Sequence, residues 1–213
     1  MKIDARTVTI SAMVLFMAMV SAHATIVTSM SDPSLDEAYL ENFSSARHGT
    51  DSFLRFNDLT ITAPGSVFQI SNEYSGLYNT QGNSLNNDEG FSRELLFTFS
   101  TPQAVFGFNY GALDQSWTFS VYDSSHHLIE STLVAPDFAS NAGDFVALTS
   151  KSPDIAYATF TEATGRHDYI LLDNLMYSVE VPEPSDYAVF VFGAAVAFVA
   201  YRRSRSWKVQ SAL

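Results

Sequence analysis

The chain has 213 residues and no cysteine, which excludes a disulfide framework, a cysteine-ligated zinc site and a thiol nucleophile. Hydrophobic residues make up 46% of the chain and aromatic residues 14%, so the composition is too apolar for a disordered protein. The formal net charge is −12, and an acidic body is a poor partner for nucleic acid, whose phosphates bind Lys and Arg. We interpret the acidity as a solvated surface, with a divalent-cation site as the alternative.

The first 24 residues have the pattern of a secretory signal peptide. Lys2 and Arg6 form a positively charged start, and residues 8–20 are mostly apolar. Ala22 and Ala24 fit the small-x-small rule for cleavage. We predict cleavage after Ala24, with an uncleaved membrane anchor as the alternative. The signal would place the body of the protein outside the inner membrane.

Residues 25–180 show the pattern of an all-β domain. One stretch, residues 33–43, is helix-like, with Ser31 or Asp32 as its cap. The rest consists of short β-rich runs between turn residues. The expected strands are 52–56, 59–62, 66–71, 94–100, 104–110, 117–122, 128–134, 145–148, 155–160, 169–172 and 174–178. Strands at this spacing, with no helices between them, predict an antiparallel β-sandwich, and a jelly roll is the natural version at this length.

A long polar segment, residues 72–93, separates two of the expected strands. A loop of this length in a compact domain is functional or mobile. Its residue types suit stacking and hydrogen bonding to a sugar, as in a lectin, and the candidates are Tyr74, Tyr78, Asn79, Gln81, Asn83, Asn86 and Asn87. The alternative is an ordinary solvated connection.

The C-terminal segment has three parts in a fixed order. The turn Val181-Pro182-Glu183-Pro184 comes first, the apolar run 188–201 follows, and Arg202, Arg203 and Arg205 form a basic cluster. At ~1.5 Å per residue the apolar run would make a helix of roughly 21 Å, short of the ~30 Å hydrocarbon core. We therefore predict a C-terminal transmembrane helix that is held only transiently, with a plain single-pass anchor as the alternative. The positive-inside rule keeps the arginines cytoplasmic.

This tail resembles the sorting signal of exported bacterial proteins of the PEP-CTERM type. The middle is also similar to the β-sandwich of many such proteins, in the segments Leu40-Glu41-Asn42-Phe43, Phe106-Gly107-Phe108, Val121-Tyr122-Asp123 and Leu172-Asp173-Asn174-Leu175. The resemblance implies a layout of signal peptide 1–24, β-sandwich ectodomain 25–180, sorting signal 181–206 and cytoplasmic tail 207–213. It also implies that an exosortase recognises and cleaves the chain near Pro182-Glu183-Pro184. The body would then reach the cell surface or an extracellular matrix, in association with exopolysaccharide or biofilm.

The same resemblance implies a structural Ca²⁺ site. Related carbohydrate-binding jelly rolls use an early acidic residue and a late Asp, which would be Glu41 and Asp173 here. Calcium takes six to eight oxygen ligands, so other groups must contribute. The alternative is that Asp173 and Asn174 satisfy backbone groups of a turn.

The remaining polar clusters do not favour a catalyst. His126 and His127 are neighbours in an expected hairpin turn, and neighbours in an extended segment point to opposite faces. Arg166-His167-Asp168 lies in an expected loop beside Gly165. The sequence has no Gly-x-Ser-x-Gly, no His-Glu-x-x-His and no phosphate loop. We therefore expect a non-enzymatic surface or matrix protein, with a carbohydrate-binding module, or a secreted hydrolase, as the alternatives.

Overall fold

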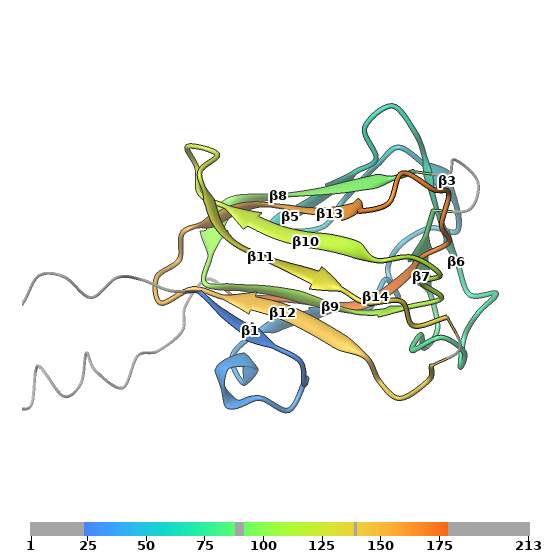
Figure 1. The fold of residues 1–213 in the computed structure, drawn as a ribbon, viewed down its shortest axis with the longest axis horizontal. Helices are drawn as coiled ribbons and strands as arrows, with labels where there is room; N and C mark the ends of the chain where they lie inside the picture. Colours follow the sequence, from blue (N-terminus) through green and yellow to red (C-terminus); the bar gives the residue numbers. More distant parts are fainter. Residues whose placement is uncertain (1–23, 88–91, 139, 179–213) are drawn as a thin grey trace, which may run out of the picture.

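The computed structural model describes residues 24–87, 92–138 and 140–178 (Figure 1). One short 3-10 helix, η1, spans Pro33–Leu35. The strands of the described part are β1 Thr25–Val27, β2 Tyr39–Glu41, β3 Gly49–Asp51, β4 Phe53–Arg55, β5 Leu59–Thr62, β6 Phe68–Ser71, β7 Ser84–Asn86, β8 Glu94–Gln103, β9 Val105–Gly111, β10 Trp117–Tyr122, β11 Leu128–Val134, β12 Phe145–Thr149, β13 Ile155–Glu162 and β14 Leu171–Ser178.

The strands form two antiparallel sheets that face each other, as Figure 1 shows. Sheet A has the order β1-β12-β9-β14-β7-β6-β3, with β2 also paired to β14, and sheet B has the order β11-β10-β13-β8-β5-β4. Within the last eight strands, β12-β9-β14-β7 lie in sheet A and β11-β10-β13-β8 in sheet B. This alternation between two four-stranded layers is the strand order of a jelly roll. The predicted antiparallel β-sandwich is confirmed.

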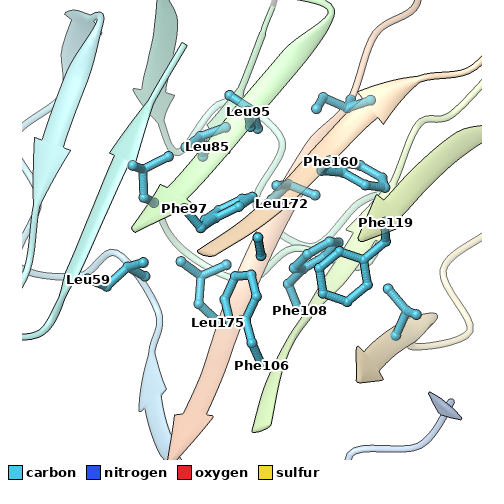
Figure 2. Close-up of a cluster of buried hydrophobic side chains, with 14 of the residues drawn as sticks. Leu59, Leu85, Leu95, Phe97, Phe106, Phe108, Phe119, Phe160, Leu172 and Leu175 are labelled. Carbon is cyan, nitrogen blue, oxygen red and sulfur yellow. The ribbon is translucent and has the colours of Figure 1, made fainter. Parts of the chain in front are cut away.

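Aromatic side chains fill the space between the sheets (Figure 2). Phe106 and Phe108 from sheet A meet Phe97, Phe119 and Phe160 from sheet B, with ring centroids 4.9–6.0 Å apart. Such tilted and edge-to-face pairs add to the free energy gained from burying apolar surface. The aromatic side chains gather here because side chains alternate along a strand, so that every second one points into the layer between the sheets.

The predicted helix over residues 33–43 is wrong. Only η1 forms, capped by the Asp32 Oδ1, which accepts a hydrogen bond from the Ser34 N–H at 2.9 Å. The chain then becomes extended, and β2 pairs with β14. The backbone groups of Tyr39 to Glu41 are therefore satisfied across the sheet, and this pairing outweighs a weak helical pattern in a short window.

The long polar segment is not entirely a loop. Its residues Ser84–Asn86 form β7, a buried strand of sheet A between β14 and β6. The two strands predicted over 169–172 and 174–178 are also one strand, β14, whose pairing with β9 is irregular between Asp173 and Met176. Asn174 takes a left-handed φ of 50° there, which absorbs the irregularity.

Both ends of the sandwich domain leave from one end of sheet A. Thr25 pairs with Thr149, Thr149 with Val105, and Val105 with Ser178, so the first and last strand residues lie at the same level. Ala24 is described, whereas Ala22, the sorting motif 181–184 and the basic cluster 202–205 lie outside the described residues. In the part of the chain that the structure describes, no helix is long and apolar enough to cross a membrane.

Candidate ligand-binding site

Four aromatic rings contact one another in succession at the end of the sandwich opposite to the chain ends. We call Tyr169, Tyr74, Tyr78 and Phe138 the aromatic row. Successive ring centroids lie 5.7, 6.0 and 6.4 Å apart. The rings come from three separate connections, β13–β14, β6–β7 and β11–β12. The side chain of Phe138 is 58% exposed, and Leu77 beside Tyr78 in the chain is 54% exposed, so the row offers apolar surface to a ligand.

A strained turn carries the central ring of the row. Tyr78 and Asn79 both have left-handed φ angles, 50° and 61°, and the Thr80 N–H donates to the Leu77 carbonyl at 3.0 Å. Two consecutive positive φ angles are typical of a type I′ turn, where Gly and Asn are favoured. A tyrosine in this position costs about 1 kcal/mol or more. Backbone strain of this kind persists only where surrounding contacts hold the chain in the strained conformation, and it is concentrated at functional sites.

The Asn79 side chain holds this turn in place. Its Nδ2 donates to the Tyr110 carbonyl at 2.8 Å and to the Asp144 Oδ2 at 3.0 Å, and its Oδ1 accepts from the Gly143 N–H at 2.7 Å. Asn141 adds a second link, because its Oδ1 accepts from the Asn79 N–H at 2.9 Å. The loop that bears Tyr78 is thereby fastened to the loop that bears Phe138. The row is organised before any ligand arrives, which reduces the entropy cost of binding.

Two carboxylates lie beside the row, on Asp137 and Asp144. Burial raises the pKa of Asp137 to about 6, and the neighbouring Asp144 adds to the rise. Burial opposes ionisation of Asp144 as well, but hydrogen bonds from Ser140, Asp137 and Asn79 outweigh it and lower its pKa. Below about pH 6 the pair therefore holds one proton, on Asp137, because two close carboxylates resist carrying two charges. At neutral pH this edge of the row is negative.

The other asparagine side chains that were predicted to bind sugar make hydrogen bonds within the fold. The Asn83 Nδ2 donates to the Phe43 carbonyl at 3.1 Å, and Gln81, whose side chain is exposed, donates its backbone N–H to Asp173. Asn86 is buried in β7, and Asn87 bonds Ser92, Asp168 and Ile170 through both ends of its amide. These residues hold the segment in place. Of the predicted sugar-binding types, only Tyr74, Tyr78 and Asn79 belong to the row or support it.

Asp168 connects the turns at this end of the molecule. Its Oδ2 accepts from the Trp117 Nε1–H at 2.7 Å and the Gln115 N–H at 3.0 Å, and its Oδ1 accepts from the Asp114 N–H at 2.8 Å and the Tyr169 N–H at 3.0 Å. Because this carboxylate accepts hydrogen bonds from four N–H groups, we assign it a structural role. It positions Tyr169, the first ring of the row.

Glu41 and Asp173, the predicted calcium ligands, are both buried. The Glu41 Oε1 accepts from the Phe43 N–H at 2.8 Å, and Asp173 accepts from the N–H groups of Gln81 and Asn174, both at 2.7 Å. Burial raises the pKa of Asp173 to about 6 despite these bonds. Among the described residues, no group of three or more acidic or histidine side chains is arranged to hold a metal. The calcium site stays a prediction.

The predicted hairpin turn over residues 123–127 is confirmed, and both histidines are exposed. Asp123 closes the turn by accepting from the Ser125 and His127 N–H groups. His126 takes the left-handed φ of 62° that a glycine would adopt more easily. Its ring stacks on Tyr157, with centroids 4.3 Å apart and planes 15° apart, and this contact offsets part of the strain.

Sequence reasoning missed Phe138 and Tyr169 as partners of Tyr74 and Tyr78. Phe138 follows Pro136-Asp137, a turn-forming pair, and the sequence pattern predicts Tyr169 as the first residue of a strand. An aromatic residue in a turn is the signal that would have pointed to Phe138. Nothing local indicates that three connections meet, because that depends on how the strands are ordered in the two sheets.

No protein-family model matches the chain, and no curated protein matches it. Among solved structures, it is similar to the K2 cleaved adhesin domain of Lys-gingipain, with 12% identity over 67% of this chain and 98% of that chain and a TM-score of 0.44. A family 29 carbohydrate-binding module is similar at 13% identity over 74% of this chain and 90% of that chain, with a TM-score of 0.31. A variant of such a module in complex with cellulohexaose is similar at 13% identity over 74% of this chain and 92% of that chain, also with a TM-score of 0.31. We draw nothing about ligands from these scores, because all lie below 0.5.

Proposed function

We propose that the sandwich is a carbohydrate-binding module and that the aromatic row is its binding surface. The observation that carries the proposal is a partly exposed row of four rings, one of which, Tyr78, lies on a strained turn that hydrogen bonds of Asn79 and Asn141 hold in place. The face of an aromatic ring is electron-rich and attracts the C–H groups of a sugar ring. The polar groups beside the row, on Asp137, Asn141 and Asp144, suit the sugar hydroxyls. The module itself is non-catalytic in this proposal.

A glycan array followed by calorimetric titration tests this function. The full chain would be kept in a zwitterionic detergent without a sugar headgroup and screened against oligosaccharides of glucose, xylose, mannose and galactose. We expect Phe138→Ala and Tyr78→Ala each to weaken binding of the best oligosaccharide about tenfold or more, since truncating a contact aromatic costs ~1.4 kcal/mol or more.

The matched control is Phe53→Ala. Phe53 is 53% exposed, close to the exposure of Phe138, but lies on β4 outside the row. Its truncation should leave the affinity unchanged. The proposal fails if no oligosaccharide binds, or if Phe53→Ala weakens binding as much as Phe138→Ala does.

We also propose that the module is exported and sorted through its tail. The support is the order of signal peptide, Pro182-Glu183-Pro184 turn, apolar run and basic cluster in the sequence. An exosortase would cleave near the turn and release the module to the cell surface or matrix. The intact mass of the mature protein from an exosortase-bearing host tests this, since a C-terminus still at Leu213 would contradict cleavage.

A further inference from the structure

The two carboxyl groups beside the aromatic row belong to the β11–β12 connection, the loop that carries Phe138. Asp137 immediately precedes Phe138, and Asp144 immediately precedes β12. Both side chains are half-buried, and the two carboxyl groups lie within hydrogen-bonding reach of each other. The Asn79 Nδ2 lies 3.0 Å from the Asp144 Oδ2 and 3.4 Å from the Asp137 Oδ2. This carboxyl pair therefore joins the loop to the turn that bears Tyr78.

No positive charge balances the carboxyl pair. Among the described residues, neither member forms an ion pair with a lysine, arginine or histidine. Its side-chain donors, Asn79 and Ser140, are neutral. From β9, burial and the two carboxylates raise the pKa of Tyr110, so this hydroxyl stays uncharged. The β9–β10 connection bonds the loop through the Leu113 carbonyl at 2.8 Å, and its Asp114 is exposed and acidic.

A hydrogen bond between two carboxyl groups requires a proton on one of them, because two carboxylates have no donor. Burial and the adjoining Asp144 raise the pKa of Asp137 to about 6, so Asp137 holds this proton at pH 5 and has lost most of it at pH 7. A raised pKa in the folded state stabilises the fold below the ordinary value, and this contribution is lost as pH rises through the folded value. The carboxyl pair therefore holds the loop best in mildly acidic solution, and repulsion replaces the bond above it.

Ionisation of the carboxyl pair acts on two rings of the row. Phe138 follows Asp137 directly, so separation of the two carboxylates moves the backbone that carries its ring. Asn79 offers one Nδ2 to both carboxyl groups, and Tyr78 precedes it in the chain. The same separation therefore weakens the hydrogen bonds that hold the strained turn. A ligand that needs both rings in place binds the protonated form better and shifts the population toward it.

We propose that the carboxyl pair of Asp137 and Asp144 is a pH-sensitive switch of the aromatic row, which holds a glycan while Asp137 carries a proton and releases it when both carboxylates are ionised. The inference rests on the proposed function of the row and adds the regulation of that site. It gives the buried acidic pair a role that contact with sugar hydroxyls alone does not require.

The test titrates the full chain, in the same sugar-free detergent, with the neutral oligosaccharide of glucose, xylose, mannose or galactose that binds best at pH 5. Such a sugar has no group that titrates between pH 5 and 7, so a change in affinity comes from the protein. If only the protonated form binds, about one tenth of the molecules are competent at pH 7, and the loss is limited to roughly tenfold. We expect the wild-type affinity to fall about three- to tenfold between these pH values.

Asp137→Asn should remove this dependence and bind at both pH values as the wild type does at pH 5. The amide, like the protonated carboxyl, donates to Asp144 and carries no charge. The urea midpoint of this variant at pH 7 should equal or exceed that of the wild type, because the repulsion between the carboxylates is gone. A variant that is less stable at pH 7 and still binds more weakly there would contradict the switch.

Asp173→Asn is the matched control. Burial also raises the pKa of Asp173 to about 6, and Asp173 accepts from the Gln81 N–H in the loop that bears Tyr78. Its replacement should leave the pH dependence of binding in place. The switch is overturned if the wild type binds equally at pH 5 and 7, if its affinity rises with pH, or if Asp137→Asn keeps the wild-type dependence. Absence of binding at both pH values would overturn the proposed function of the row, and the switch with it.

Discussion

Gly111→Ala tests the coupling between the fold and the aromatic row without touching the row itself. Gly111 ends β9, and a Cβ built on it would lie 2.1 Å from the Tyr78 carbonyl oxygen and 2.7 Å from its carbon. The strained turn must therefore move by about 1 Å or more to restore ordinary contact. That displacement weakens the bonds of Asn79 to Tyr110 and Gly143, each worth about 1 kcal/mol. With overpacking of 1–3 kcal/mol, we expect about 2–4 kcal/mol of lost stability and a tenfold or larger loss of oligosaccharide affinity.

Gly107→Ala is the matched control, because Gly107 lies on the same strand away from the row. Its added Cβ would lie 2.3 Å from the Ala147 Cβ, so this variant also overpacks a tight site. Urea unfolding followed by the fluorescence of the buried Trp117, together with calorimetric titration of the best oligosaccharide, separates stability from binding. The reasoning is refuted if Gly111→Ala binds as the wild type does, or if Gly107→Ala lowers the affinity equally.

Three further predictions concern the supports of the site and of the sheet. Asp168→Ala should lower the free energy of unfolding by about 3 kcal/mol or more, because it leaves the Trp117 Nε1–H and the Asp114 and Gln115 N–H groups without their acceptor; a urea midpoint within error of the wild type would contradict this. Burial raises the pKa of Asp173 in the folded state to about 6, well above its ordinary value. The folded state therefore binds more protons between these values, and stability should fall as pH rises from about 4 to 6, by ~2 kcal/mol. Urea unfolding in EGTA at both pH values measures this. Asp173→Asn should remove this part of the pH dependence and leave the part that Asp137 contributes in the same window. Restoration of stability at pH 7 by added Ca²⁺ would support the calcium prediction. His126→Gly should be more stable than His126→Ala by about 1 kcal/mol, since both lose the Tyr157 stack and only glycine relieves the left-handed φ; equal melting temperatures would count against strain at this turn.

Alternation predicted the strands whose inner face is apolar and whose outer face is polar. β5, β10 and β11 begin and end at the predicted residues, because each lies in a sheet with one solvated face. β7 could not be predicted, since Ser84 and Asn86 are polar residues that are buried by pairing with β6 on one side and with β14, far away in the sequence, on the other. The candidate site, too, could be predicted only in part. Tyr74 and Tyr78 have recognisable residue types, but their alignment with Tyr169 and Phe138 depends on three connections meeting at one end.

The positions of the chain ends bear on how the row would meet a glycan. Thr25 and Ser178 leave sheet A at one level, and the predicted sorting motif begins three residues after Ser178. The row lies beyond the opposite end of β14, whose eight residues span about 26 Å. If the tail holds the chain at a membrane, the row therefore points away from the bilayer and is accessible before cleavage as well as after it. Cleavage would change where the module goes and leave the affinity of the row unchanged, so an anchored and a released form that bound the same oligosaccharide with different affinities would contradict this orientation.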